Sequence, residues 1–403
     1  MSFLKKMAVS AALFASAFAG TSDDDGHKTV QQICVENGFQ FETHTVTTED
    51  GYILTIFRIP GLIGEAAPAT PKPVVFMQHG LMDAADAWVM NWPDVAPAFV
   101  TARAGYDVWL GNTRGNTYSR AHVKYDPDGW ISREKFWAYD FEQMGTYDIP
   151  ADLNYITNLT KVPKVTYIGH SQGTTQMFYG LSELQSYYAS KVNLFVALGP
   201  VTKITGDSGY MYEIAQNYDE IDDWAKMYNY YEVMPRNWRW APFWREYCTA
   251  FTAVCEAIEY EFISHNPLAD DPDRFKVYID HEPNGTSMQS VLMFAQNMGM
   301  NRFQKWCPYY NCPLCIGDAH RTSDLIPLQN DKNVPVALIV AKDDTVATPV
   351  DAQWTMSQIG AEVIHYQEIA GGHVTYIIGK DMSFFTKDVM GLLAQYNPSA
   401  TNH

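Results

Sequence analysis

Positively charged side chains are scarce in this sequence. It contains 28 lysines and arginines against 46 aspartates and glutamates, which gives a net charge of −18 over 403 residues. Phosphate backbones and anionic lipid headgroups repel a chain of this charge, so we expect neither nucleic acid nor an anionic membrane surface as a partner. The charge is compatible with an acidic compartment, where protonation of carboxylates would relieve the self-repulsion.

Long apolar runs are missing beyond the N-terminus. Lys5 and Lys6 precede the apolar run Met7–Phe18, and Ala17-Phe18-Ala19 is a small-residue cleavage site. The run is shorter than the roughly 20 residues that span a bilayer, and the arrangement is typical of a secretory signal peptide. We therefore expect residues 1–19 to be removed. The mature protein is expected to have no transmembrane segment and to be extracellular or lysosomal.

Cysteine is also sparse, with six residues in the chain. An exported protein passes through an oxidising route, where disulfides form. The candidate pair is Cys248 and Cys255, which are close neighbours in sequence. The other four are Cys34 and the cluster Cys307, Cys312 and Cys315. A zinc knuckle needs a second paired set of ligands, which this cluster lacks, so disulfides are favoured and no metal is expected.

Two sequons of the form Asn-X-Thr are present, at Asn158 and Asn284. In an exported protein each is a candidate glycosylation site if its asparagine lies on the surface. Surface exposure cannot be read from the sequence, so both are expectations for the structure to test.

Short apolar strands alternate with helical segments through much of the chain, which is 47% hydrophobic. Expected strands lie in a hairpin over 41–60 and at 74–79, 106–110, 165–170, 193–198, 334–341 and 362–368; expected helices lie at 147–159 and 381–396. This alternation predicts an α/β fold with a mostly parallel sheet covered on both faces. From 201 to 305 the strand pattern gives way to helical segments rich in aromatic residues and methionine. We expect 20–200 and 306–403 to form one core and 201–305 to form a helical cap.

A nucleophile-elbow motif, Gly-His-Ser-Gln-Gly at residues 169–173, stands between an expected strand and an expected helix. The sharp turn forces Ser171 into a strained conformation, and a side chain at Gly169 or Gly173 would crowd it. Ser171 is the candidate nucleophile. The backbone N–H of Gln172, at the positive end of the following helix, is a candidate oxyanion donor. The motif also occurs by chance, so its partners must decide its meaning.

An activated serine needs a base and an acid, which follow it in α/β-hydrolases in the order Ser, Asp or Glu, His. Asp343 and Asp344 come directly after one expected strand, and either is a candidate acid. His373 follows the next strand on a loop with two glycines and is the candidate base, whereas His365 lies within that strand. Each aspartate also has an ordinary reading as a turn residue.

A second oxyanion donor is expected from the loop after an early strand. His79-Gly80-Leu81 fits this requirement, because glycine allows a close backbone approach and the Leu81 N–H would then be the donor. The pair His79-Gly80 would also be compatible with a simple strand-terminating turn.

The sequence resembles the acid lipases, the family that contains gastric lipase and lysosomal acid lipase. The matching motifs are Val46–Leu54, His79–Leu81, Asp107–Ser119, Phe136–Trp137, Glu142–Ala151, Gly169–Thr175 and Pro283–Ser287. The resemblance implies an α/β-hydrolase fold with a helical cap whose lid covers the site, and no metal or organic cofactor. It assigns Ser171 as nucleophile, His373 as base and Leu81 and Gln172 as oxyanion donors. It places the acid at Asp344 because the interval to His373 matches the family, with Asp343 as the fallback.

The resemblance implies a serine lipase that hydrolyses neutral lipid esters, triacylglycerols or cholesteryl esters, at a lipid–water interface. Two departures leave the substrate open: Ala-Lys stands before Asp343 in place of the family's glycines, and the residues around His373 differ from the usual His-x-Asp-Phe. Alternatives are an esterase or acyltransferase acting on other esters, and a lipid-binding or storage protein without catalysis. A non-catalytic protein would predict a broken triad, whereas this chain has all three members.

Overall fold

The computed structural model describes residues 24–66, 68–206, 210–236, 247–248, 255, 264–308 and 322–397. The expected signal peptide, the cleavage site after Ala19, Cys312, Cys315 and part of the expected cap lie outside the described residues. None of the described helices has a stretch that is both long and apolar enough to cross a bilayer.

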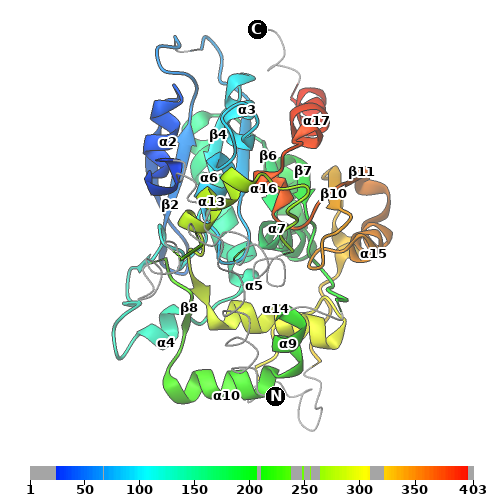
Figure 1. The fold of residues 1–403 in the computed structure, drawn as a ribbon. Helices are drawn as coiled ribbons and strands as arrows, with labels where there is room; N and C mark the ends of the chain where they lie inside the picture. Colours follow the sequence, from blue (N-terminus) through cyan, green and yellow to red (C-terminus); the bar gives the residue numbers. More distant parts are fainter. Residues whose placement is uncertain are drawn as a thin grey trace.

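The described residues form a nine-stranded sheet at the centre of the molecule (Figure 1). Its strands are β1 (Glu42–Thr47), β2 (Tyr52–Ile59), β3 (Val74–Gln78), β4 (Asp107–Leu110), β5 (Ala121–His122), β6 (Val165–His170), β7 (Val192–Leu198), β10 (Val336–Ala341) and β11 (Val363–Ile369). The order is β1-β2-β4-β3-β6-β7-β10-β11, with β5 paired to β2. The pairs of β2 with β1, β4 and β5 are antiparallel, and the pairs from β4 to β11 are parallel. The predicted mostly parallel sheet and its opening hairpin are confirmed.

Alternate strand residues enter two separate apolar layers, as the period of two along a strand requires. In β3, for example, Val75 and Met77 enter one layer, whereas Val74 and Phe76 enter the other. These strand residues are fully buried, which explains the continuous apolar runs in the sequence. Both faces of the sheet are therefore covered, as the sequence predicts.

Helices supply the outer part of each layer. The first layer is covered by α2 (Val30–Glu36), η2 (Ala85–Val89), α3 (Pro97–Arg103), α13 (Pro272–His281), α16 (Thr375–Ile378), η6 (Phe384–Val389) and α17 (Met390–Tyr396), with η1 (Asp24–His27) against α13. The second layer is covered by α4 (Arg133–Phe136), α5 (Phe141–Gln143), η3 (Met144–Asp148), α6 (Ile149–Thr160), α7 (Gln172–Glu183), α8 (Gln185–Lys191), α14 (Met288–Met300), η4 (Leu328–Asn330) and α15 (Pro349–Ile359), which η5 (Gly360–Glu362) follows.

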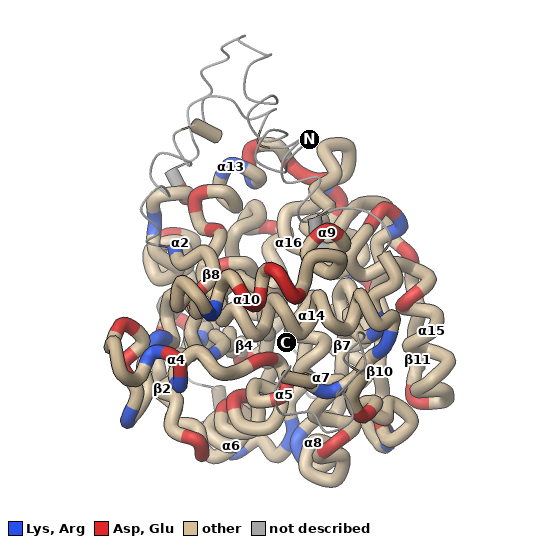
Figure 2. The backbone as a smooth tube through the Cα atoms, turned by 90° about the horizontal axis from the view of Figure 1, so that it is seen from below, with Lys and Arg blue, Asp and Glu red and all other residues tan. Residues whose placement is uncertain are grey.

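The segment expected to form a cap contains α9 (Tyr210–Gln216) and α10 (Tyr218–Tyr228), which pack on α14 at the lower edge of Figure 1. Ile214, Tyr218 and Leu292 form a small apolar cluster there. Acidic positions follow one another along α10, which faces the viewer in Figure 2.

The expectation that strands are absent from 201–305 is wrong at one place. Strand β8 (Glu232–Val233) pairs antiparallel with β9 (Thr286–Ser287). Each has two residues, too few to produce the alternation by which a strand is recognised in a sequence.

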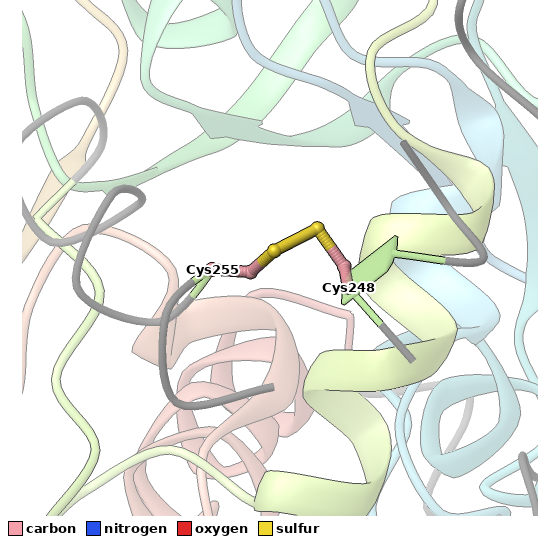
Figure 3. The surroundings of a disulfide bond; sticks show 2 residues. All are labelled: Cys248 and Cys255. Carbon is pink, nitrogen blue, oxygen red and sulfur yellow. A yellow bond between two sulfur atoms is a disulfide. The ribbon is translucent and has the colours of Figure 1, made fainter. Parts of the chain in front are cut away.

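A disulfide joins Cys248 to Cys255, as predicted (Figure 3). Cys307 is buried and disulfide-bonded as well, whereas Cys34 is a free, buried thiol whose pKa is raised by burial. Among the described residues, no cluster of histidine, cysteine, aspartate or glutamate is arranged to hold a metal ion.

Candidate active site

Ser171 stands at the sharp turn between β6 and α7. Its backbone has φ 52° and ψ −120°, a conformation that residues other than glycine rarely adopt. The turn brings Gly173 so close to β3 that a Cβ atom would lie 2.3 Å from the Gln78 carbonyl oxygen, and a Cβ on Gly169 would lie 2.8 Å from the Gly173 carbonyl carbon. The strained elbow and its two obligatory glycines are therefore present as predicted.

Parallel strands bring the other candidate residues to the same edge of the sheet. The last residues of β6 and β7, His170 and Leu198, are register partners, and Leu198 is paired with Ile339 of β10. The loops after β10 and β11 therefore emerge beside the elbow, although they follow it by more than 160 residues. This edge is where open α/β sheets place their ligand sites.

Ser171, His373 and Asp344 form one hydrogen-bonded chain. His373 Nε2 lies 2.7 Å from Ser171 Oγ, and His373 Nδ1 lies 2.7 Å from Asp344 Oδ2. The other Asp344 carboxylate oxygen accepts hydrogen bonds of 2.8 Å from the N–H groups of Val346 and Ala347. All three side chains are largely buried, with 3–8% of each residue exposed. The arrangement can deprotonate a serine and stabilise the imidazolium that results.

Asp343 has a different environment from its neighbour. Its side chain is exposed and accepts a hydrogen bond of 2.9 Å from Asn266 Nδ2. His365, the other histidine of this region, lies within β11 and contacts Gln367 at 3.3 Å. The geometry therefore brings Asp344, and neither of these two residues, to the His373 imidazole.

The electrostatics keep the acid ionised. Burial by itself raises the pKa of Asp344, but the neighbouring His373, through its charge and its hydrogen bond, and the N–H groups of Ala347 and Val346 outweigh it. The pKa of Asp344 is consequently below its ordinary value. An ionised acid can hold the His373 Nδ1–H in place and leave Nε2 free to take the proton from Ser171.

The loop that carries Leu81 passes directly beside the nucleophile. A Cβ atom on Gly80 would lie 3.2 Å from Ser171 Cβ, so the backbone approaches the serine closely at this point. In the part of the chain that the structure describes, the N–H groups of Leu81 and Gln172 have no hydrogen-bond acceptor. Neither N–H group is therefore occupied within the described residues, a condition that the donors of an oxyanion hole must meet.

Two histidines that the motif analysis did not assign a role support this site. His79 Nε2 accepts a hydrogen bond from the Thr113 N–H at 3.1 Å, so its Nδ1 carries the proton and donates to the Gly80 oxygen at 2.8 Å. Burial lowers the pKa of His79, which disfavours the charged form of the imidazole. His170 Nε2 donates to the His373 carbonyl oxygen at 3.0 Å, and burial together with the charge of His373 lowers the pKa of His170 to about 3. Each of the two histidines stands within a motif that the sequence makes conspicuous. This position was the signal from which a supporting role could have been predicted.

The two sequons differ in exposure. Asn158 is exposed on α6 and stays a glycosylation candidate. Asn284 is 1% exposed, and its Nδ2 donates to the His281 oxygen and to Glu282 Oε1, both at 3.0 Å. The condition of surface exposure is therefore not met at Asn284 in the folded protein, because its side-chain amide is buried and hydrogen-bonded.

Family comparisons cover most of the chain. Residues 73–380 match the family described as alpha/beta hydrolase fold, and residues 30–92 match the partial alpha/beta-hydrolase lipase region. The solved structure of the alpha/beta hydrolase GrgF from Penicillium sp. sh18 has a TM-score of 0.52 to this chain at 14% identity, and the match covers 89% of this chain and 99% of that one. That likeness concerns the fold alone.

Sequence relatives extend over nearly the full length. Lipase member K from Homo sapiens is 32% identical, with 93% of each chain covered. Gastric triacylglycerol lipase from Rattus norvegicus is 31% identical, with 90% of each covered. Lysosomal acid lipase/cholesteryl ester hydrolase from Homo sapiens is 31% identical, with 93% of this chain and 92% of the relative covered.

Proposed function

Because this chain belongs to the acid lipase family of the α/β-hydrolase fold, we propose that Ser171, His373 and Asp344 are the catalytic triad of its lipid ester hydrolysis. The chain is a lipase-type ester hydrolase, as its relatives are. The observation that carries the assignment is the continuous hydrogen-bonded chain from Ser171 through His373 to Asp344, with 2.7 Å at each step.

In the acylation step, His373 Nε2 takes the proton from Ser171 Oγ while that oxygen attacks the ester carbonyl carbon. Negative charge develops on the carbonyl oxygen, and we propose that the Leu81 and Gln172 N–H groups bind it. Collapse of the tetrahedral intermediate breaks the bond to the leaving alcohol oxygen, which receives the proton from His373. An acyl-serine remains at Ser171.

In the deacylation step, the same groups work on water. His373 removes a proton from a water molecule as the water oxygen attacks the acyl carbon. The second tetrahedral intermediate collapses, Ser171 Oγ regains its proton from the imidazolium, and the fatty acid leaves. Asp344 stays ionised through both steps and stabilises the charged imidazole. Each atom in this cycle is supplied by the triad, the ester and water.

We propose triacylglycerols or cholesteryl esters as the substrates, met at a lipid–water interface. The support is the activity for which two relatives are named, gastric triacylglycerol lipase and lysosomal acid lipase/cholesteryl ester hydrolase. The same relatives support an extracellular or lysosomal place of action. Residues 201–305 are proposed as a cap over the site, and residues 20–200 and 306–403 as the hydrolase core that it interrupts.

A substrate panel tests this function. Wild-type protein and Ser171→Ala are assayed on triacylglycerol emulsions, cholesteryl ester emulsions and soluble short-chain esters from pH 4 to pH 8. We expect the wild type to hydrolyse at least one emulsified ester, and we expect Ser171→Ala to lose that turnover while it keeps the wild-type circular dichroism spectrum. Activity on soluble esters alone would contradict the neutral-lipid assignment. Full activity of Ser171→Ala would contradict the proposed triad.

A further inference from the structure

Ser264 lies between the loop that carries Asp344 and the loop that carries His373. It is 2% exposed, and its backbone has a φ of 55°, in the left-handed region. It precedes Asp343 by 79 residues, so its place beside these loops is set by the fold and not by the chain. It belongs to the C-terminal part of the segment expected to form the cap.

The Ser264 hydroxyl holds the loop of the acid. Ser264 Oγ donates to the Asp343 carbonyl oxygen at 2.9 Å and accepts from the Thr345 N–H at 3.1 Å. Asp343 and Thr345 are the two chain neighbours of Asp344. One side chain therefore binds the backbone on both sides of the proposed triad acid.

The Ser264 backbone holds the loop of the base. Its carbonyl oxygen accepts from the His373 N–H at 3.0 Å. The approach is so close that a Cβ atom on Gly372 would lie 1.8 Å from the same oxygen. A glycine is therefore required immediately before the proposed triad base for this contact to form.

These contacts connect the two loops beyond the last paired residues of the sheet. The ladder between β10 and β11 ends at the pair Ala341 and Ile369, and the Asp343 N–H then donates to the Gly371 oxygen at 2.9 Å. The hydrogen bond between Asp344 and His373 lies farther out, where Ser264 bridges the two loops. A displacement of about 1 Å between catalytic groups can lower a rate by about 100-fold. A residue that fixes the distance between these two loops can therefore affect the reaction rate.

We propose that Ser264 is a positioning residue that sets the separation of the Asp344 and His373 loops and thereby pre-organises their hydrogen bond. Its contacts are to backbone groups of the loops, and its effect on the reaction passes through Asp344 and His373. The inference rests on the proposed triad, because it assigns Ser264 a role in positioning two of its members.

The variant Ser264→Gly isolates the hydroxyl. Glycine adopts a φ of 55° at no steric cost and keeps the carbonyl that binds His373, whereas an alanine would retain the backbone strain that Ser264 already carries. With p-nitrophenyl butyrate, a soluble ester, we expect kcat to fall by about 10-fold to 100-fold while KM stays at the wild-type value. We expect the unfolding temperature not to fall in step, because relief of backbone strain offsets the lost hydrogen bonds.

Ser132→Ala is the matched control. Ser132 Oγ also accepts from one backbone N–H and donates to one backbone carbonyl, both of Asp126, at 2.9 Å and 3.2 Å. Ser132 lies in the loop before α4, outside the proposed triad, and we expect its variant to keep wild-type kcat and KM. Wild-type kcat in Ser264→Gly would overturn the proposal, as would a loss of activity that only parallels a fall in unfolding temperature. If Ser171→Ala is inactive at the same time, the proposed triad stands and only the role of Ser264 fails.

Discussion

At the scale of single residues, Asp343 and Asp344 are adjacent and chemically identical, yet the fold separates them completely. Asp344 is 3% exposed and bonded to His373, whereas Asp343 is exposed and bonded to Asn266. The difference arises because the loop after β10 turns one carboxylate inward and the other outward. Only the inward carboxylate can orient an imidazole.

The separate variants Asp344→Asn and Asp343→Asn should therefore behave differently. An asparagine at 344 keeps the shape of the side chain but favours the wrong histidine tautomer, and we expect kcat to fall by about 10⁴-fold, the loss typical of this change in a serine triad. We expect Asp343→Asn to retain wild-type turnover. Steady-state kinetics on p-nitrophenyl butyrate measure both, and a larger loss at position 343 would refute the assignment of the acid.

Whether a site residue can be predicted from the sequence depends on whether its identifying signal lies close to it in the chain. Ser171 and His373 could be assigned because a short motif and the order of strands carry the signal. The choice between Asp343 and Asp344 rested on the family interval and not on chemistry, because both follow the same strand. Ser264 could not be found at all, since its contacts join residues at least 79 apart and its own neighbours carry no recognisable motif.

At the scale of elements, the strand, turn and helix around Ser171 were predictable because each part has its own signal. An apolar β-branched run, a glycine-flanked serine and a helical segment follow one another, and the structure has β6, the elbow and α7 in those places. The short pair β8 and β9 had no such signal, because it depends on a tertiary contact between residues more than 50 apart. Burial of Asn284 likewise follows from packing and not from its sequon.

The packing of α13 and α14 shows that two helices of the proposed cap contribute to the core layers. Helix α13 lies within residues 201–305, yet Phe275, Val277 and Ile279 enter the same apolar layer as α2 and α3. Helix α14 similarly places Met293 and Phe294 in the layer of α7. The part of the proposed cap from α13 onward therefore packs into the same two apolar layers as the core helices.

At the scale of the whole molecule, acidic side chains occur both on the surface and in the interior. Burial raises the pKa of several carboxyl groups, in particular Glu142 and Asp140, where the charge of Asp140 adds to the effect on Glu142. The groups Asp148, Asp152, Glu282 and Asp331 are shifted in the same direction, with burial as the largest cause. Together with the net charge of −18, these groups make the free energy of unfolding depend on pH.

The protein should consequently be more stable at pH 5 than at pH 8. A carboxyl whose folded pKa is raised binds more protons in the folded than in the unfolded state, so its contribution to stability is complete below the unfolded pKa of about 4 and is lost as pH rises. Asp344 and Asp86, whose pKa is lowered, act oppositely and lose their contribution only as pH falls below that value. The buried histidines His79 and His170, whose pKa is also lowered, favour the folded state above the unfolded pKa of about 6.5, so they oppose the trend within this interval but are fewer than the raised carboxyls. We expect the thermal unfolding midpoint at pH 8 to lie about 5 °C or more below that at pH 5.

The control for this prediction is Glu142→Gln, measured by circular dichroism at constant ionic strength. Glutamine is neutral and can still accept the hydrogen bond that Glu142 Oε1 receives from the Trp306 N–H. We expect this variant to show a smaller decrease in midpoint between pH 5 and pH 8 than the wild type. A midpoint that rises over this interval would contradict the role given to the buried carboxyls.

The central claim is that Ser171 is the nucleophile, activated by His373. The most direct measurement is covalent labelling with diethyl p-nitrophenyl phosphate, followed by peptide mass mapping. We predict one phosphoryl adduct per chain, on the peptide that contains Ser171, appearing in step with the loss of esterase activity, and no adduct in His373→Ala under the same conditions. Complete inactivation with Ser171 unmodified, or an adduct that forms equally fast without His373, would contradict the account.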